Sequence, residues 1–464
     1  MTAIVETSRD EPAEIEAARS AAAAGRLVEA FAALRPLTKG PQAPLAHKTI
    51  ADILAARRHD VEAAQAYRRA IQLDASFAEA HNNLANVLWR KSKDLKALDH
   101  YGQAIALKPD YAGARTNLAL VKAEVGALDE AIALIEAIPA GRRTVATWRA
   151  LAMVLCQSGR LDEAFAAVSQ ALSRDERDVE SLAAASAILR SRDRIEDALA
   201  MARRAIDAGP VHPAGYMEAA AALSASGAHD EAVAHARQAV EVAPTDARAH
   251  DALASGLLSA GKIEEARPFL EHAIKLDPHH LMAIFHLGVL FEREALHEKA
   301  EEAFRQVLAT QPTYTPAAIN LAGVLINLGK ADEAETRLRE VVAREPQNGI
   351  AWSSLSLALE ELSRHEEAEK AAQKGVEFQP DAAQTHLNLG IALQVTGDLT
   401  GAQAAFRKAL EIDPELVPAV FSIVATDSAG GSDLLDKAKS LLDRRDLSEV
   451  QRSQLHFALA NLHE

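Results

Sequence analysis

One alanine recurs along most of the chain at intervals of 33 or 34 residues. All twelve positions of this column hold alanine: Ala30, Ala63, Ala97, Ala131, Ala164, Ala198, Ala232, Ala266, Ala300, Ala334, Ala368 and Ala402. A repeat of this length is one supersecondary unit, which cannot bury its apolar face alone and has to stack on neighbouring copies. The chain is therefore predicted to be a row of similar units rather than a few globular domains.

Three further columns repeat in step with the alanine. Small residues lie twelve positions before it: Ala18, Ala51, Ala85, Ala119, Ala152, Ser186, Ala220, Ala254, Gly288, Ala322, Ser356 and Gly390. Proline lies twelve positions after it in eight units: Pro109, Pro210, Pro244, Pro278, Pro312, Pro346, Pro380 and Pro414. Glycine lies between the two small columns in seven units: Gly25, Gly126, Gly159, Gly227, Gly261, Gly329 and Gly397. Because proline ends helices and glycine suits tight turns, each unit is predicted to be a first helix, a turn and a second helix.

Numbered so that the two small columns fall at positions 8 and 20, the units resemble the tetratricopeptide repeat, which has a 34-residue period. Trp148 and Trp352 fall at position 4, and Phe304 and Phe406 fall at position 24. Leucine occupies position 7 in eight units. The resemblance implies an all-α, right-handed superhelical solenoid of about 12 helix-turn-helix units plus C-terminal helices, with a concave groove lined by the first helices.

The repeat pattern predicts three regions. Residues 1–10 are expected to be a disordered lead, and residues 11–416 the repeat array, with units starting near 11, 44, 78, 112, 145, 179, 213, 247, 281, 315, 349 and 383. In the fourth unit, Pro139 and the turn at 141–143 are expected to shorten the second helix. Residues 417–464 are predicted to hold a degenerate repeat, a glycine-rich loop at 427–432 and the start of a further, incomplete repeat. This unfinished pattern leads us to expect that the natural polypeptide continues.

Composition argues against several classes of protein. The net charge of -16 is unfavourable for nucleic-acid binding, which relies on clustered lysine and arginine. The sequence has no uninterrupted apolar run of the roughly 18 residues that a membrane-spanning helix needs. The single cysteine, Cys156, excludes an internal disulfide and a thiolate metal cage. We expect a cytoplasmic protein that binds neither nucleic acid nor membrane.

Catalytic and cofactor motifs do not emerge from the sequence. No plausible arrangement of nucleophile, base and acid is found, so the chain is predicted to have no catalytic residues, no cofactor and no metal site. His279, His280 and His286 resemble a metal-binding cluster. However, the six-residue separation of the last two does not match the spacing of ligands on one helix face, and we expect exposed surface histidines.

The family resemblance implies that positions 2, 5, 6, 9, 12 and 13 of each first helix face the groove. Position 6 is asparagine in four units: Asn83, Asn117, Asn320 and Asn388. An asparagine amide can donate to and accept from the backbone of an extended peptide whatever its sequence. Similar asparagine rows line the superhelix of O-linked sugar transferases. The alternative interpretation is that these asparagines tie neighbouring repeats together or face water.

Two units have further candidate groove residues. In the unit that starts near 78, these are Asn82, Asn86, Trp89 and Arg90, where the tryptophan is either an anchor for a partner or a filler between repeats. In the unit that starts near 281, Phe285 belongs to an apolar strip flanked by His286 and Arg293, for which core packing is the alternative. Asn327 completes the set of predicted peptide-binding residues.

Three functions are compatible with this pattern. The first is a non-catalytic scaffold that binds an extended peptide or protein partner in its groove. The second is the substrate-docking arm of a larger sulfotransferase or O-linked glycosyltransferase, because the closing phrase LSE…LHFALANL is similar to the junction before the catalytic domain of bacterial repeat-bearing sulfotransferases. Any transferase activity would then belong to residues outside this chain. The third is a scaffold that self-associates into a homo-oligomer through its end faces.

Overall fold

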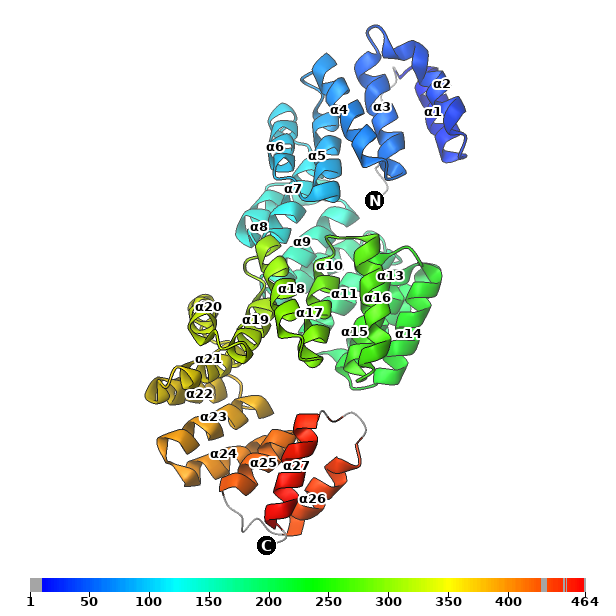
Figure 1. Ribbon diagram of the computed structural model, residues 1–464. Coiled ribbons are helices and arrows are strands. Elements are labelled where there is room, and N and C mark those ends of the chain that lie inside the picture. Colours follow the sequence, from blue (N-terminus) through cyan, green and yellow to red (C-terminus); the bar gives the residue numbers. More distant parts are fainter. Residues whose placement is uncertain (1–10, 427–431, 445–446, 448, 463–464) are drawn as a thin grey trace. The chain divides into compact units, whose positions relative to one another are not determined.

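Two columns of small residues, one on each helix of a unit, allow paired helices to approach closely, and the structure is built from such pairs. The computed structural model describes residues 11–426, 432–444, 447 and 449–462 (Figure 1). These residues contain helices and turns but no strand. The predicted lead at 1–10 and residues 427–431 of the predicted loop lie outside the described residues.

The chain divides into two compact units, Met1–Ala228 and His229–Glu464. The first contains α1 (Ala13–Ala23), α2 (Leu27–Leu34), η1 (Arg35–Thr38), α3 (Ala43–Ala56), α4 (Asp60–Leu73), α5 (Ala78–Ser92), α6 (Lys96–Leu107), α7 (Ala112–Glu124), α8 (Leu128–Glu136), η2 (Ala140–Arg142), α9 (Val145–Gln157), α10 (Leu161–Leu172), α11 (Val179–Ser191), α12 (Ile195–Ala208) and α13 (Pro213–Ala225). The second contains α14 (His229–Val242), α15 (Ala247–Ser259), α16 (Ile263–Leu276), α17 (Leu281–Arg293), α18 (His297–Thr310), α19 (Thr315–Asn327), α20 (Ala331–Arg344), α21 (Gly349–Glu361), α22 (His365–Phe378), α23 (Ala383–Thr396), α24 (Leu399–Ile412), α25 (Val417–Thr426), α26 (Ser432–Leu442) and α27 (Glu449–Leu462).

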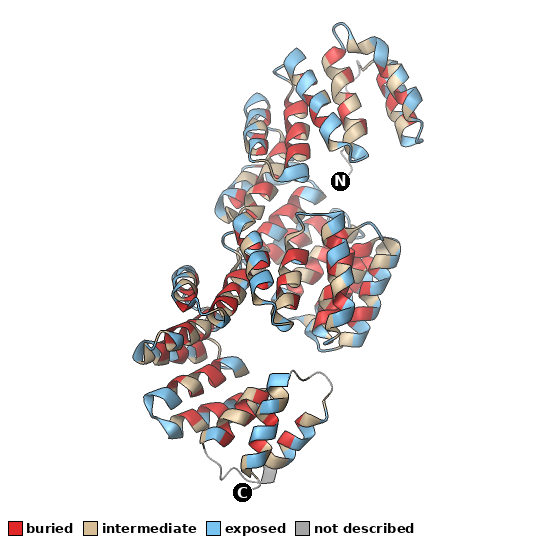
Figure 2. Cartoon of the chain, in the orientation of Figure 1, coloured by how far each residue is buried: buried red, intermediate tan, exposed pale blue. Residues whose placement is uncertain are grey.

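Within each compact unit, helices pack in the manner of a repeat array. Second helices pack against the first helix of their own repeat, as α20 does on α19, and neighbouring first helices also contact each other, as α19 does with α17 and α21. Figure 2 shows the buried residues where helices face each other and the exposed residues on the outer surfaces. The predicted all-α fold of stacked helix-turn-helix repeats, followed by C-terminal helices, is confirmed.

The residues of the two small columns are buried in the helix packing. All twelve residues of the alanine column are fully buried, and every residue of the earlier small column is buried as well. In that column, the Ser186 hydroxyl donates a hydrogen bond to the carbonyl of Ala198, at 2.8 Å. The columns therefore reflect close helix packing, because a larger side chain at either place would push two backbones apart.

The turn between the two helices requires a left-handed residue in every repeat. Gly329 has φ 71° at this place, as its sequence column predicts. Five repeats place another residue there with positive φ, for example Ala295 with φ 57°. Conformation at this position is thus imposed by the packing of the two helices even where the residue does not favour it.

The predicted shortening of the second helix in the fourth repeat is present. The second helix of the fourth repeat, α8, has only nine residues, and the guanidinium groups of Arg143 and Arg174 lie over the Trp148 ring nearby, at 4.6 and 5.4 Å from its centroid. Near the C-terminus, α27 packs on α25 and α26 through a small apolar cluster. Of the described helices, none combines the length and apolar character needed to cross a bilayer.

Candidate functional site

A recurrent hydrogen bond joins neighbouring first helices in both compact units. It connects the side chain at position 6 of one repeat with position 5 of the preceding repeat, 35 residues earlier. Asn117 Nδ2 donates to Asn82 Oδ1 at 3.0 Å, and Asn388 Nδ2 donates to Ser353 Oγ at 2.8 Å. These two asparagines therefore join repeats to each other, which is the alternative interpretation of the asparagine row.

Around Asn117 the polar contacts extend over three first helices. Asn82 Nδ2 donates to Asn83 Oδ1 at 2.9 Å, and Asn83 Nδ2 donates to Asp52 Oδ1 at 3.0 Å. The same Asp52 oxygen accepts from the Tyr67 hydroxyl at 2.6 Å. The side chains of α3, α5 and α7 are thus connected by one chain of hydrogen bonds.

The other candidates on α5 are also engaged within the chain. Asn86 Oδ1 accepts from the Tyr101 hydroxyl at 2.6 Å. Trp89 is buried and its indole N–H donates to Glu124 Oε2 at 2.6 Å, so the tryptophan lies between repeats. Arg90 is exposed, forms an ion pair with Asp60 and donates to the carbonyl of Ala55 at 3.1 Å.

On α17 one of the predicted residues, His286, contacts a buried carboxylate. His286 Nδ1 lies 2.7 Å from Asp251 Oδ1, which repeats the link from position 6 to position 5. Phe285 packs edge-on against Tyr314, with 5.4 Å between ring centroids, and Arg293 donates to the carbonyl of Leu258 at 2.7 Å. Core packing and inter-repeat contacts account for these three predicted site residues.

The expectation that His280 and His286 are exposed surface histidines is wrong. His280 Nε2 lies 3.5 Å from Asp251 Oδ2, and both imidazoles are largely buried by the packing of α17 on α15. Burial raises the pKa of the Asp251 carboxyl, but the two imidazoles lower it by more, so that it lies below its ordinary value. His279 is exposed. Among the described residues, no three metal-ligating side chains come together.

Asn320 and Asn327 differ from the other predicted asparagines. Within the part of the chain that the structure describes, neither side chain has a hydrogen-bond partner. Asn320 occupies position 6 of its repeat, but the residue 35 positions earlier is Phe285, whose ring cannot accept or donate as Asn82 or Ser353 does. Its amide is left unpaired because the neighbouring repeat is apolar at the partner position.

These two amides lie on one face of α19. Asn320, Gly323 and Asn327 are three and four residues apart, which places them along one side of a helix, and we call this set the α19 face. Asn320 and Gly323 are partly exposed and Asn327 is exposed. A β-carbon at Gly323 would have only Glu292 Oε1 within 4 Å, so the backbone there is open. The α19 face therefore combines free amides with an uncovered stretch of helix backbone.

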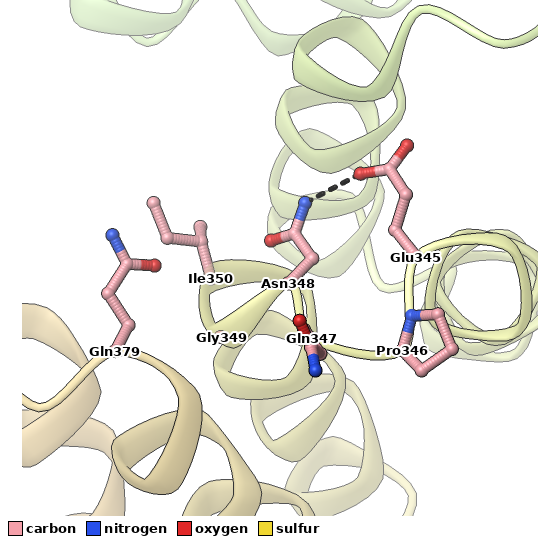
Figure 3. A pocket seen from close by; sticks show the side chains of 7 residues that line it. All are labelled: Glu345, Pro346, Gln347, Asn348, Gly349, Ile350 and Gln379. Atoms are coloured by element: carbon pink, nitrogen blue, oxygen red, sulfur yellow. Dashed lines mark hydrogen bonds between the residues drawn. The ribbon is translucent and has the colours of Figure 1, made fainter. Parts of the chain in front are cut away.

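A separate open hollow of about 780 Å³ lies at the loop that leads into α21. Glu345, Asn348, Ile350 and Gln379 are among its lining residues, and they come from this loop, from α21 and from the end of α22 (Figure 3). Its one carboxylate, Glu345, already accepts hydrogen bonds from Thr315 and from Asn348, the latter at 2.9 Å. The carboxylate of this hollow is therefore already paired within the chain.

Sequence reasoning missed Asp251, Gly323 and Glu292 as members of these sites. Asp251 could have been found from the sequence, because it lies 35 residues before His286, the same separation as between Asn82 and Asn117. Neither Gly323 nor Glu292 differs from ordinary helix residues in the sequence. Their importance depends on the contacts of the residues around them.

Comparison with known families finds the repeat along much of the chain. Family models described as tetratricopeptide repeat match residues 82–146, 182–247 and 252–315, residues 293–359, and residues 383–416. A model described as TPR repeat matches residues 60–92. Together the matched segments span more than half of the chain. All these models describe the repeat itself, and the resemblance of the last segment to a sulfotransferase junction stays a prediction.

Comparison with curated proteins finds no match. Among solved structures, the chain is similar to a chain of the APC/C hetero-tetramer Cut9-Hcn1, with 15% identity, a TM-score of 0.48, and coverage of 92% of this chain and 98% of that chain. It is also similar to yeast Tom70, with 15% identity, a TM-score of 0.43, and coverage of 91% and 96%. Because both TM-scores lie below 0.5, these likenesses say nothing about what this chain binds.

Proposed function

Because the chain belongs to the tetratricopeptide-repeat family, we propose that it is a non-catalytic scaffold that holds an extended peptide segment of a partner protein against its first helices. The α19 face is the centre of this binding surface. Asn320 and Asn327 hold the peptide backbone, and the open helix backbone at Gly323 lets the peptide approach closely. The substrate-docking arm of a larger transferase is a special case of the same proposal, in which the partner is a substrate protein.

The observation that carries the proposal is the unpaired state of Asn320. Amides at the same repeat position in α7 and α23 are used within the chain, whereas the Asn320 amide has no partner among the described residues. Asn320 and Asn327 are seven residues apart, or about 10 Å at the rise of an α-helix. About three residues of an extended peptide span this length, so one backbone can reach both amides.

A library of immobilised random decapeptides tests the proposal. Wild-type protein should bind a subset of peptides, and the double variant Asn320→Ala, Asn327→Ala should bind them more weakly. Each lost hydrogen bond is expected to cost about 0.5 to 1.5 kcal/mol of binding free energy. Affinities from fluorescence anisotropy with the selected peptides measure this loss.

The matched control is Gln238→Ala, which removes an exposed amide from the second helix α14. It should leave peptide affinity unchanged. Equal affinity of the double variant and the wild type would show that the α19 face is not the binding surface. Thermal melts of all three proteins separate a loss of binding from a loss of folding.

Self-association is a second candidate because a specific apolar surface supports it. On α27, Val450 and Phe457 are 67% and 46% exposed, and the Phe457 ring lies 5.2 Å from that of Phe421. Together with Glu449, Ser453 and Gln454 they line a hollow of about 460 Å³. Light scattering over a range of protein concentrations tests this candidate, and a constant monomer mass would exclude it.

A further inference from the structure

The carboxylate of Glu292 is unpaired beside the α19 face. Glu292 belongs to α17 and is partly buried. Within the described residues, its side chain has neither a hydrogen bond nor an ion pair. Its Oε1 is the atom that a β-carbon at Gly323 would meet, at 4.0 Å, which places the carboxylate next to the open backbone between Asn320 and Asn327.

Neighbouring basic side chains are engaged elsewhere. Arg293, the next residue, donates to the carbonyl of Leu258 at 2.7 Å, and the Lys299 ammonium lies over the Phe291 ring, 5.6 Å from its centroid. Lys330, at the start of the following second helix, contacts Glu301 at 2.7 Å. None of these three cations forms an ion pair with Glu292 in the part of the chain that the structure describes.

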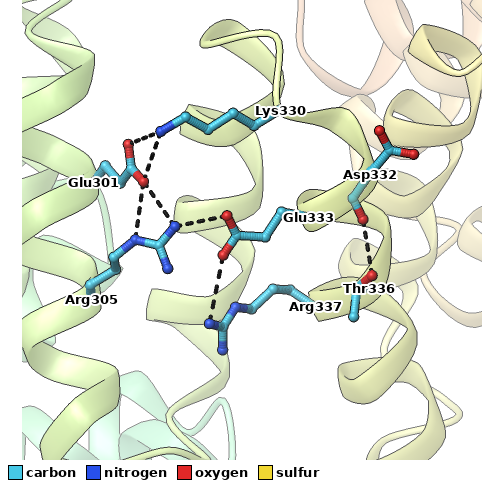
Figure 4. A network of polar contacts seen from close by, with 7 residues as sticks. All are labelled: Glu301, Arg305, Lys330, Asp332, Glu333, Thr336 and Arg337. Atoms are coloured by element: carbon cyan, nitrogen blue, oxygen red, sulfur yellow. Dashed lines mark hydrogen bonds and ion pairs between the residues drawn. The ribbon is translucent and has the colours of Figure 1, made fainter.

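Other acidic groups of this region contrast with Glu292. Figure 4 shows Lys330 and Arg305 both reaching Glu301, while Arg305 also contacts Glu333. Arg305 lies 2.8 Å from each of the two carboxylates. The second helices α18 and α20 thus pair their charges with each other, and the unpaired carboxylate lies on a first helix next to free amides.

We propose that Glu292 pairs with a lysine or arginine side chain of the peptide whose backbone Asn320 and Asn327 hold. This inference rests on the proposed function and names the chemistry of the partner. An extended peptide lying along α19 passes Gly323 between its two amide contacts. The open backbone at Gly323 leaves room there for a long side chain, and a guanidinium or ammonium group complements a carboxylate that is already partly removed from water.

Desolvation of Glu292 supports the same inference. Burial raises the pKa of its carboxyl, and the charge of Arg293 offsets this only in part. A basic ligand side chain would stabilise the ionised form and lower that pKa again. Peptide binding should therefore release protons from Glu292 over the acidic range in which the free protein still holds one.

A positional-scanning decapeptide library, with each residue type fixed in turn at each position, tests the inference on the full chain. Wild-type protein should select lysine or arginine at one position. Replacement of that residue by leucine in the best peptide should weaken binding about tenfold, the effect of losing one charge-assisted hydrogen-bonded pair. Glu292→Gln should lose the selectivity, and Glu292→Lys should favour aspartate or glutamate at the same position.

The matched control is Glu302→Gln, which neutralises an exposed glutamate on the second helix α18. It should keep the basic selectivity. If wild-type protein binds peptides without favouring a basic residue, or if Glu292→Gln keeps that preference, the inference fails while the scaffold proposal stands. If no peptide binds, both fail. Cooperative thermal unfolding of the three variants near the wild-type melting temperature establishes that folding is retained.

Discussion

The ring of Phe304 occupies the space that a side chain at Gly288 would need. A β-carbon built at Gly288 would lie 2.7 Å from Phe304 Cε1, closer than real contacts allow. Gly390 and Phe406 have the same relationship three repeats later. These are the two repeats in which position 24 is phenylalanine, and both have glycine in the small column of the first helix. The large residue on one helix and the absent side chain on the other form one packing unit.

Two glycine substitutions should have opposite effects because of this packing. Gly288→Ala forces the buried Phe304 ring to move and should lower the free energy of unfolding by about 1 to 3 kcal/mol. Gly323→Ala adds a methyl group to open space and removes helix-destabilising flexibility, so it should raise the same quantity by about 0.5 to 1 kcal/mol. Urea denaturation measures both. A Gly288→Ala protein as stable as the wild type would contradict the packing relationship.

Replacing an asparagine by alanine should lower the free energy of unfolding only where its amide forms a hydrogen bond within the chain. Asn117→Ala leaves the buried Asn82 oxygen without its donor and should cost about 1 kcal/mol or more of stability. Asn320→Ala breaks no hydrogen bond among the described residues and should stay within about 0.5 kcal/mol of the wild type. Chemical denaturation of the two variants gives the comparison. Similar losses in both would mean that Asn320 has a structural role.

Asp251 should contribute pH-dependent stability. Its pKa in the folded state lies below its ordinary value, so its contribution is complete above the ordinary aspartate pKa of about 3.9 and is lost as the pH falls through the folded value. Asp251→Asn should cost about 1.5 to 3 kcal/mol at pH 7, since it weakens a charged hydrogen bond to His286. Unfolding curves between pH 7 and pH 3 should show this difference shrinking at the acidic end. A difference that does not depend on pH would argue against an ionised Asp251.

Glu292→Gln should change peptide selectivity without lowering the stability of the fold. The pKa of Glu292 is raised in the folded protein, so the ionised carboxylate opposes folding once the pH exceeds the ordinary glutamate value of about 4.3. The neutral variant should then be as stable as the wild type at pH 7 or more stable by up to about 0.5 kcal/mol, and the gain should vanish below pH 4. Thermal melts across this range measure it. A clear loss of stability at pH 7 would indicate that Glu292 has a partner within the chain.

The architecture could be predicted because its signals recur. A helix pair that stacks on identical neighbours needs small residues at the same two places each time, and the column that includes Ala300 and Ala334 makes this visible without any structure. Turn residues were less predictable. Ala295 adopts the left-handed conformation that glycine has in other repeats, because the closing of the helix pair overrides the preference of the single residue.

The binding surface could be predicted only as a set of candidate positions. Asn117 and Asn320 occupy the same place in their repeats and have the same side chain, yet one is bonded and the other is unpaired. The difference comes from a residue 35 positions away, Asn82 in one case and Phe285 in the other. A pattern that describes each repeat separately does not contain this information.

The sequence by itself determined the repeat, its helices and the close packing of each pair, because those features depend on residue size and backbone preference within one unit. Only the tertiary structure decided which polar groups remain available to a partner. That outcome depends on contacts between side chains of adjacent repeats. Asp251 contacts two histidines of the next repeat, whereas Glu292 lies unpaired beside Gly323. Such contacts join residues about one repeat apart, and a hydrogen bond forms there only when both positions carry suitable polar side chains.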